Sequence, residues 1–375
     1  MVITRTPYRV SFFGGGTDYP PWYLKNGGAV LCTTIDKYCY ISCRILPPFF
    51  EHKFRVVYSK VELCQSIDEI QHPSVRAALR FLKFNRGLEI HHDGDLPARS
   101  GIGSSSSFTV GLVHSLYSLQ GVMPNKRRLA MESIHIEQQM IKETVGSQDQ
   151  VSAAFGGLNR IDFSRDGFID VQPVTLAEAR QDEFNRHLML FYTGIKRTAS
   201  TIADGYVKSI SKKHIALGRM HQMVGEGLDT LCSNRNICDF GELLHEGWLL
   251  KKSLGSMVSN PIVDDLYDRA RDAGAIGGKI LGAGSGGFLL LFVPPSAQED
   301  VRNALSKLIH VPFKFEHGGS QVIFYEPQQD YHELERDREE RDVDSFRELT
   351  SVVKSMIVDM PTTSHKVEDD MELAT

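Results

Sequence analysis

A glycine- and serine-rich stretch, LPARSGIGSSSSFTV at residues 96–110, constrains the fold more than any other part of the chain. Before it, LEIHHDGD (88–95) alternates apolar and polar residues, which predicts a strand that ends in turn residues. After it, Val110, Val113 and Leu116 recur at helical spacing. A flexible linker lacks ordered elements directly on both sides, so this stretch is predicted to be a strand-to-helix loop.

The residue types of this loop suit a backbone site for an anion. Glycine lets the chain approach a ligand closely and adopts positive φ. Amides at a helix N-terminus face an anion, and the helix dipole adds to the attraction. Serine hydroxyls can bond phosphate oxygens or ligate Mg²⁺, a cation that prefers oxygen. No GK[ST] follows the glycines, so the loop is not a Walker P-loop, and an ordinary helix cap remains the alternative.

Two further glycine clusters strengthen the case for a ligand site. TPYRVSFFGGGTDYPPWY, residues 6–23, brings Arg9 and Asp18 close to three glycines directly after an apolar strand pattern. KILGAGSGGFLLLF, residues 279–292, sets glycines and a serine between two strand patterns. Each cluster alone could be a tight turn. Three such loops in one chain, two with hydroxyls and one with an arginine and an aspartate, favour a shared function over three unrelated turns.

A carboxylate lies in the apolar stripe of a predicted helix. The pattern predicts a helix over residues 127–143, in which Glu137 lines up with Ile134 and Ile141. Burial of an unpaired carboxylate costs roughly several kcal/mol. Glu137 therefore needs a partner, and a bound metal is one candidate. The alternative is a glutamate at the edge of the stripe that reaches solvent.

A second acidic residue follows in GSQDQVSAAFGG. Ser147 and Gln150 have the spacing of a capping box, which puts Asp149 in the first turn of a new helix. Acidic residues in the first turn are common, because they complement the helix dipole. Spacing alone therefore leaves Asp149 either a catalytic residue or an ordinary acid at a helix start.

The chain is long enough, at 375 residues, for two domains with separate cores. Helical and strand patterns mix throughout, which predicts an α+β fold. We place one domain at residues 1–180 and a second at 181–326, which opens with the apolar pattern HLMLFY. The pattern at 29–43 predicts one strand, or two joined near Asp36. The charged segment 327–375 is predicted to be a tail, partly helical or disordered.

Composition bears on the partners and the compartment. The net charge of −5 gives no reason to expect a nucleic-acid partner or an anionic membrane. No apolar run approaches the roughly 18 residues of a transmembrane helix. The start, MVITRTPYRV, lacks the apolar core and cleavage site of a secretory signal, so a cytoplasmic protein is expected. The 6 cysteines include no CxxC pair, so neither structural zinc nor a disulfide framework is expected.

Together the three glycine-rich segments resemble the motifs of the GHMP kinases, the superfamily of galactokinase and of homoserine, mevalonate and phosphomevalonate kinases. PARSGIGSSSS resembles the P-x-x-x-G-L-G-S-S motif, TPYRVSFFGGGTDY the motif that galactokinases write as PGRVNLIGEHTDY, and KILGAGSGGFLLLF the C-terminal glycine motif. They occur in the family's order, and the resemblance covers residues 1 to about 326. Within the superfamily, GGGTDYPPWY, GSQDQVSAAFGGLN and FYTGIKRTASTI look most like the D-glycero-D-manno-heptose 7-phosphate kinases.

This resemblance implies a fold and an activity. The fold would pair an N-terminal domain like ribosomal protein S5 with a ferredoxin-like C-terminal domain. A monomer or homodimer would use ATP and Mg²⁺ to phosphorylate the anomeric hydroxyl of a seven-carbon sugar phosphate. Gly14–Gly16 stand where galactokinases have Gly-Glu-His, which argues against galactose. The alternatives are another sugar kinase, of the galactokinase or fucokinase type, and a non-catalytic protein that senses sugar and ATP.

The resemblance also implies site residues. Asp149 matches the aspartate that acts as base or orients the substrate, and Arg9 matches its arginine partner. Ser105 and Glu137 match the Mg²⁺ ligands. The positions that match the ATP-binding motif are Pro97, Gly101, Ile102, Gly103, Ser104, Ser105 and Ser106. The positions that match substrate-binding motifs are Gly15, Gly16, Thr17, Asp18, Gly284, Ser285 and Gly286.

A heptose 7-phosphate would carry a dianion several ångströms from the reacting hydroxyl, which requires a basic anchor. Lys196 and Arg197, in TGIKRTAS, follow the strand pattern HLMLFY at the start of a helical pattern. Arg197 is the predicted anchor, since a guanidinium binds phosphate with two parallel hydrogen bonds. The alternative is a solvated basic pair at a helix start.

Overall fold

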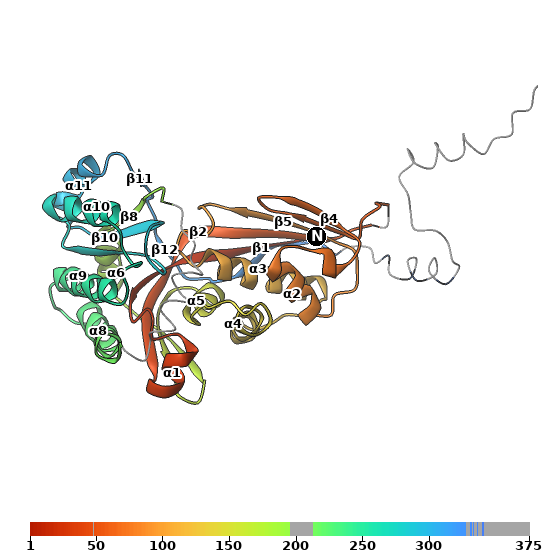
Figure 1. Ribbon diagram of the computed structural model, residues 1–375, viewed down its shortest axis with the longest axis horizontal. Helices are drawn as coiled ribbons and strands as arrows, with labels where there is room; N and C mark the ends of the chain where they lie inside the picture. The colour runs from red at the N-terminus through yellow and green to blue at the C-terminus, as the bar shows by residue number, and fades with distance from the viewer. Residues whose placement is uncertain are drawn as a thin grey trace, which may run out of the picture.

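The computed structural model of the protein describes residues 1–47, 49–195 and 213–327, with residues 331, 333, 336 and 340. These residues form two units, each built on its own sheet (Figure 1). Helices lie against both sheets, so the chain has the predicted α+β character.

In the described part of the chain, the larger sheet has 9 strands. Its main path runs in the order β13-β1-β2-β5-β3-β4, while β12 and β6 also pair with β2, and β7 pairs with β6. The strands are β1 (Val2–Phe13), β2 (Gly28–Ile45), β3 (Phe54–Val57), β4 (Val61–Cys64), β5 (Leu88–Gly94), β6 (Leu158–Phe163), β7 (Ile169–Pro173), β12 (Phe315–Glu316) and β13 (Gln321–Tyr325).

Strand β2 is continuous but irregular where the sequence suggested a join. Pro7 of β1 pairs with Tyr38, while the next residue, Tyr8, pairs with Ile35. Asp36 and its neighbour therefore bulge out of the ladder, and the Asp36 amide donates to the carbonyl of Lys314 at 2.9 Å. A bulge of this kind bends a strand and raises its twist, which lets one long strand pair with partners at both ends.

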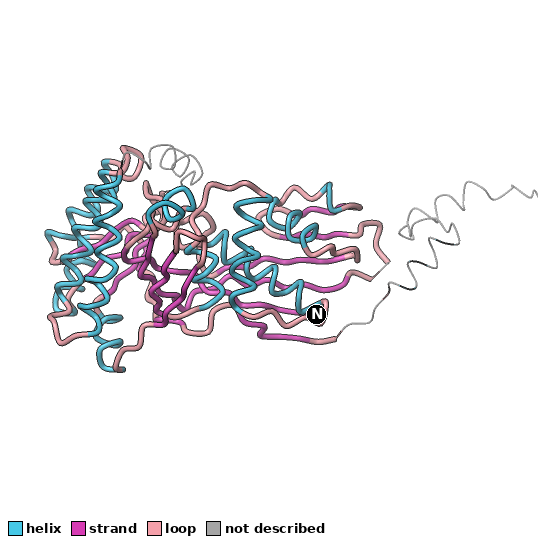
Figure 2. The backbone as a smooth tube through the Cα atoms, turned by 90° about the horizontal axis from the view of Figure 1, so that it is seen from below, coloured by secondary structure: helices cyan, strands magenta, loops and turns pink. Residues whose placement is uncertain are grey.

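One layer of helices covers the larger sheet, on its lower side in Figure 1 and toward the viewer in Figure 2. The helices of this layer are α2 (Pro73–Phe81), α3 (Ser104–Leu119), α4 (Lys126–His135) and α5 (Gln148–Phe155). Helix α3 packs across β1 and β2, and most of its side chains are buried. It approaches the sheet closely at Gly111, where an added Cβ would lie 2.8 Å from Thr6 Oγ1. The middle of α3 is thereby held close to β1.

The smaller sheet has the order β11-β8-β10-β9 and carries the second set of helices, at the left of Figure 1. Its apolar strands β8 and β10 lie in the middle, where β10 is buried along its whole length, as the run FLLLF predicts. The elements of this unit are α6 (Glu178–Arg186), β8 (Leu188–Tyr192), α8 (His214–Cys232), α9 (Cys238–Ser253), α10 (Pro261–Asp272), β9 (Gly277–Ile280), β10 (Phe288–Phe292), α11 (Gln298–Ala304) and β11 (Ile309–His310).

The end of the described chain returns to the larger sheet. Strand β13 pairs antiparallel with β1, and β12 pairs with β2. The sequence pattern assigns both segments to the second domain, at 181–326, whereas their strands join the sheet of the first. The reason is that β1 has a free edge that only a late segment fills, since β2 occupies its other side.

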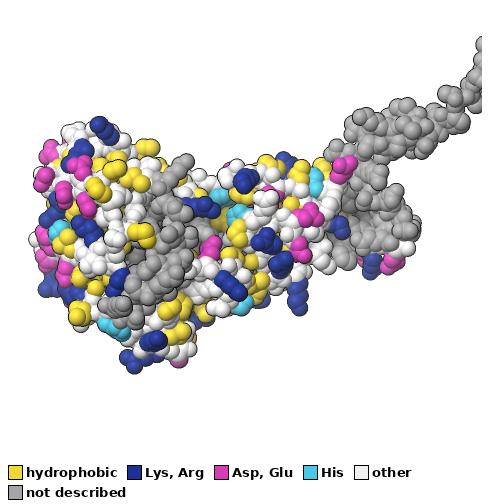
Figure 3. Space-filling view, viewed as in Figure 1, with side chains coloured by type: hydrophobic (Ala, Val, Ile, Leu, Met, Phe, Trp, Pro, Cys, Tyr) yellow, Lys and Arg dark blue, Asp and Glu magenta, His cyan; other side chains and the backbone are white. Residues whose placement is uncertain are grey.

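The surface and the cysteines complete the description. On the face in Figure 3, basic and acidic side chains are interspersed. No helix among the described residues is long and apolar enough to cross a membrane. Cys39 and Cys43 are buried on one face of β2, as their alternation predicted, and all six cysteines are free thiols.

Candidate active site

An arginine from β1 and an aspartate from α5 form the centre of the candidate site. Arg9 Nε donates to Asp149 Oδ1 at 2.7 Å and Nη2 donates to Oδ2 at 2.8 Å, a bidentate pair. The Arg9 side chain is only 4% exposed, whereas that of Asp149 is 24% exposed. Burial is the largest single effect and lowers the pKa of Arg9, but the charge and hydrogen bonds of Asp149, with smaller effects of Cys32 and Asp18, together raise it. The pair thus presents a fixed carboxylate at the surface of the site.

The glycine- and serine-rich loop rests directly on this pair. Arg9 Nη1 donates to the Gly101 carbonyl at 2.6 Å, and the Arg9 amide donates to the Ile102 carbonyl at 3.0 Å. Gly103, with φ 75°, precedes α3, and a Cβ there would lie 3.2 Å from Arg9 Cγ and 3.4 Å from Asp149 Oδ2. Glycine is needed for both the conformation and the close approach. The loop, the arginine and the aspartate are therefore one assembly.

The remaining residues of the ATP-binding prediction shape this loop. The Ser100 hydroxyl donates to the Pro97 carbonyl at 2.5 Å, and the Ser104 hydroxyl accepts from the Arg99 amide at 3.0 Å. Ser105 is exposed, in the first turn of α3. The loop therefore ends with exposed groups at the N-terminus of a 16-residue helix, where an anion is favoured.

Glu137 is completely buried, which excludes the alternative that it reaches solvent. Its Oε2 accepts from Ser106 Oγ at 2.9 Å and from Gln150 Nε2 at 2.5 Å. The Thr109 hydroxyl lies close enough to Glu137 to lower the pKa of this carboxyl, but it donates to the Ser105 carbonyl at 3.2 Å, and no donor among the described residues meets Oε1 with hydrogen-bond geometry. Burial raises the pKa of Glu137 to about 7. The sequence resemblance gave Ser105 and Glu137 as Mg²⁺ ligands, whereas in the structure the neighbouring Ser106 is the serine that donates to Glu137.

Two local predictions around these acids are wrong. An α-helix was predicted over 127–143, but the α-helix α4 ends at His135. A π-helical turn, Ile136–Met140, follows it, and the Ile141 amide donates to the Ile136 carbonyl. The capping box does not form either: Ser147 precedes α5 without a side-chain cap, and the Gln150 side chain binds Glu137 instead. The Gln150 side chain is turned toward the buried carboxylate, so its oxygen does not accept from the Ser147 amide, which donates to the Asp18 carbonyl at 3.0 Å instead.

Asp18 occupies the loop that follows β1. It is 1% exposed and accepts hydrogen bonds from the backbone amides of Gly16 at 2.9 Å and Gln148 at 3.3 Å. Burial raises the pKa of Asp18 to about 6, against the lowering effect of the Gly16 hydrogen bond, and the charge of Asp149 adds to the rise. Asp18 and Asp149 therefore belong to one electrostatic environment.

Thr17 supports the loop that follows β1. It is fully buried, and its hydroxyl lies 2.8 Å from the Gly14 carbonyl and 2.9 Å from the Ala29 carbonyl. The Ala29 amide donates to the same hydroxyl at 3.1 Å. These contacts with the backbone hold the loop onto β2, and a contact of Thr17 with a substrate stays a prediction.

The three glycines before Thr17 are not equivalent. Gly14 and Gly16 have φ of 79° and 104°, which favours glycine. Gly15 has no such φ, and a Cβ there would lie 3.7 Å from Ser11 Oγ, at ordinary contact distance. Neither conformation nor packing requires glycine at Gly15, so its missing side chain leaves room above the loop.

The C-terminal glycine loop lies against the serine loop. The Phe288 amide donates to the Ser100 carbonyl at 3.2 Å, and a Cβ on Gly287 would lie 2.0 Å from the same oxygen. Gly284 and Gly286 have positive φ and lie in this loop. The structure therefore brings together the three glycine segments that the sequence singled out.

Lys279 belongs to the site, although sequence reasoning missed it. Its side chain is buried and Nζ donates to the Phe12 carbonyl at 2.8 Å, which joins β9 to β1. Burial and the positive charge of Arg9 lower the pKa of Lys279 to about 7, despite the opposing effect of Asp18. The available signal was a lone lysine in an apolar strand directly before a glycine loop, where a charge is costly to bury.

Arg197, the predicted phosphate anchor, lies outside the described residues, as does Lys196.

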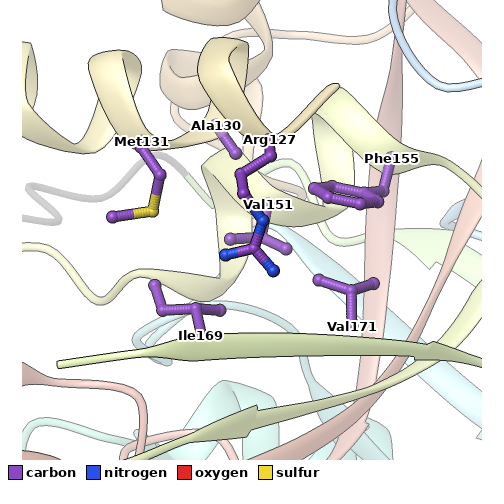
Figure 4. Close-up of a pocket in the computed structure, with 7 residues that line it drawn as sticks. All are labelled: Arg127, Ala130, Met131, Val151, Phe155, Ile169 and Val171. Carbon is purple, nitrogen blue, oxygen red and sulfur yellow. The ribbon is translucent and has the colours of Figure 1, made fainter. Parts of the chain in front are cut away.

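A small pocket between α4, α5 and β7 is shown in Figure 4. Six of its lining side chains are apolar, and the guanidinium of Arg127 lies over the Phe168 ring, 4.8 Å from its centroid. The lining contains no predicted site residue; it is Arg127, Ala130, Met131, Val151, Phe155, Ile169 and Val171.

The sequence and the fold of this chain are similar to those of known kinases. The GHMP kinases N terminal domain matches residues 73–157, and the GHMP kinases C terminal domain matches residues 230–310. The chain is 28% identical over 320 residues to the D-glycero-alpha-D-manno-heptose 7-phosphate kinase of Campylobacter jejuni subsp. jejuni serotype O:2, which covers 82% of this chain and 93% of that protein.

Two further similarities extend the comparison. The chain is 25% identical over 354 residues to the L-fucokinase/L-fucose-1-P guanylyltransferase of Bacteroides fragilis, covering 82% of this chain and 36% of that protein. The crystal structure of a D-glycero-D-manno-heptose 1-phosphate kinase from Bacteroides thetaiotaomicron superimposes with a TM-score of 0.71 at 22% identity, over 87% of this chain and 100% of that one. The fold is therefore the one that the sequence motifs implied.

Proposed function

The chain belongs to the GHMP kinases, since it carries both domains of that family, and on this premise we propose that it transfers the γ-phosphate of ATP to a sugar. The proposed acceptor is the anomeric hydroxyl of D-glycero-D-manno-heptose 7-phosphate, the substrate in the name of the Campylobacter jejuni relative. The observation that carries the proposal is the bidentate Arg9–Asp149 pair directly beneath the Gly101–Gly103 loop.

Asp149 is the group that orients the acceptor. Phosphoryl transfer passes through a loose transition state, so positioning and charge neutralisation contribute more than proton abstraction. Arg9 fixes both carboxylate oxygens, and the partial exposure of Asp149 leaves it accessible to a hydroxyl. An anomeric hydroxyl is more acidic than an ordinary alcohol, so a carboxylate that already accepts two hydrogen bonds suffices to receive its proton late in the transfer.

The serine loop is the proposed site for the phosphates of ATP. Its amides between Gly101 and Ser105 lead into the N-terminus of α3, where the helix dipole favours negative charge. The exposed Ser105 hydroxyl adds a donor at the same end. The Arg9–Gly101 hydrogen bond ties this loop to the catalytic pair, so bound phosphate and acceptor would meet beside Asp149.

Mg²⁺ fits the environment of Glu137. A fully buried carboxylate with one oxygen lacking a donor has an unmet need for positive charge, and oxygen ligands are those that Mg²⁺ prefers. Glu137 and the Ser106 hydroxyl that donates to it would hold the ion, and Ser105, which the motif resemblance gives as the ligand, is the preceding residue of α3. When bound, Mg²⁺ supplies charge neutralisation to the phosphates.

The test is an ADP-release assay with a panel of acceptors: heptose 7-phosphate, the unphosphorylated heptose, galactose and fucose. Turnover that is fastest with heptose 7-phosphate supports the proposal. Faster turnover with fucose or galactose would reassign the enzyme to another sugar. Calorimetric binding of sugar and ATP without turnover would indicate the non-catalytic sensor.

A further inference from the structure

The C-terminal glycine loop has a strained conformation that needs support. Ser285 has φ of 63°, a left-handed value that costs a residue with a side chain free energy. Gly282, Gly284 and Gly286 in the same loop also have positive φ. Such conformations persist only where surrounding contacts hold them.

One set of contacts holds the loop at Ser285 from the connection between α9 and α10. The Ser285 amide donates to the Val258 carbonyl at 2.8 Å, and Asn260 Nδ2 donates to the Ser285 carbonyl at 3.0 Å. The Ser285 hydroxyl donates to the Met257 carbonyl. This serine was predicted to bind substrate, but its amide and hydroxyl are both engaged away from the serine loop.

Lys251 holds the start of the loop. Its Nζ donates to the Ile280 carbonyl at 2.8 Å and to the Gly282 carbonyl at 2.5 Å. These two carbonyls flank the point where β9 ends and the loop begins. An ammonium with three donors can bond both at once, and bonds to a charged donor are about twice as strong as neutral ones. The lysine comes from the last turn of α9, so a helix of the smaller unit sets the path of the loop.

The other end of the loop touches the serine loop. Gly287 lies so close to Ser100 that only glycine fits, and the Phe288 amide bonds the Ser100 carbonyl. A shift of the loop at Gly282 would therefore be transmitted toward the proposed phosphate site.

We propose that Lys251 is a positioning residue for phosphoryl transfer: it fixes the Gly282–Gly287 loop against the serine loop before ATP arrives. This inference rests on the proposed kinase function. Lys251 acts through the loop and does not touch ATP. Loss of the lysine should therefore lower kcat and leave the KM for ATP nearly unchanged, because the loop would be misplaced in the transition state while the phosphate site itself stays intact.

The test compares Lys251→Met and Lys251→Arg with Lys252→Met. Lys252 is a matched control: it also lies in the last turn of α9 and near the Trp248 ring, but its Nζ pairs with Asp264 at 3.2 Å and bonds no loop carbonyl among the described residues. The first measurement is hydrogen exchange of the full-length proteins on peptides that cover residues 281–291. It needs no substrate, so it reports on the loop even if the heptose assignment fails.

Lys251→Met should speed exchange of the loop amides by about fivefold or more, with other peptides unchanged, and Lys252→Met should not. The second measurement is kcat with the fastest acceptor of the panel above. Lys251→Met is expected to lower kcat about tenfold, while its KM for ATP stays within about twofold of the wild-type value. Lys251→Arg keeps the charge and the donors, so it should recover part of the lost kcat.

Three results would overturn the proposal. Unchanged exchange in Lys251→Met would show that the lysine does not hold the loop. Faster exchange with unchanged kcat would show that the held conformation is irrelevant to transfer. A higher KM for ATP with unchanged kcat would make Lys251 a nucleotide contact. If Lys251→Met does not fold, the same comparison is made between Lys251→Gln and Lys252→Gln, which remove the charge and keep a polar side chain.

Discussion

Arg9 is buried and Asp149 is partly exposed, and this difference gives each residue its place in the proposed mechanism. The buried guanidinium has both its charge and its geometry satisfied by the carboxylate and by Gly101, so it acts as a support. The partly exposed carboxylate is the member that a substrate can reach.

Asp149→Asn tests that assignment. The amide keeps the shape but removes the charge that orients and accepts from the hydroxyl, so kcat should fall by about 10² or more. Binding of ATP, measured by calorimetry, should survive, because the serine loop remains. A variant with near-wild-type kcat on the preferred sugar would remove Asp149 from the mechanism.

Glu137→Gln tests the proposed ion site with little change of shape. The amide oxygen can still accept from Ser106, but the charge that would hold Mg²⁺ is gone. The Mg²⁺ concentration for half-maximal rate should rise about tenfold. The increase in Tm that Mg²⁺ and ATP together produce should shrink. If both dependences stay as in the wild type and only the Tm without ligand falls, Glu137 is a structural residue.

Asp18 gives a pH dependence with a definite sign. Its pKa in the folded protein, about 6, lies above the unfolded value of 3.8, so the folded state binds the proton more tightly. The stabilisation from this proton is complete below about pH 4 and is lost as pH rises through about 6. The neutral side chain in the Asp18→Asn variant carries no such penalty, so the Tm of the variant relative to wild type should increase between about pH 4.5 and pH 7.5. A difference that is constant with pH would contradict the burial-driven shift.

Single elements show both the strength and the limit of the sequence as a guide. Strand β10 and helix α3 follow directly from an apolar run and a Gly/Ser loop, and the meeting of three glycine segments was predictable from their resemblance to family motifs. The π-helical turn at Ile136–Met140 was not, because periodicity reports which face is apolar and carries no information about one extra residue per turn. The same turn positions Glu137, the acid that Gln150 binds in place of a cap.

Asn260 links two elements and allows their contributions to be separated. Its Oδ1 accepts from the amides of Ile262 and Val263 at the start of α10, while its Nδ2 donates to the Ser285 carbonyl. Asn260→Ala removes both and should lower the free energy of unfolding by about 1–2 kcal/mol. Asn260→Asp keeps the cap and removes the donor, so it should retain most of the stability yet speed hydrogen exchange at Ser285. Equal destabilisation by both variants would mean that the cap contributes little.

At the scale of the whole molecule, the two units are interlocked by the late strands. Thr6 of β1 bonds the Ser320 hydroxyl at 2.9 Å, and the Met1 and Glu326 backbones bond each other. The domain boundary near residue 180 remains a prediction, and β12 and β13 show that a single cut cannot separate the two sheets.

Truncation tests this interlocking. A protein that ends at residue 327 keeps the pairing of β13 with β1 and should match the full-length Tm. A protein that ends at residue 319 loses β13 and exposes the edge of β1, so its Tm should fall by more than about 5 °C or it should aggregate. Equal melting of the two truncated proteins would show that β13 is dispensable for the sheet.

The pairing of β13 with β1 also has a consequence for synthesis on the ribosome. Residues of β1 emerge first, but their outer neighbour is made only after the whole smaller unit. At about 5–20 residues per second, the edge of β1 stays unpaired for roughly ten seconds or more in every nascent chain. During synthesis the larger sheet therefore cannot be completed before all strands of the smaller sheet have been made, and the nascent chain is expected to depend on chaperones that shield an open strand edge.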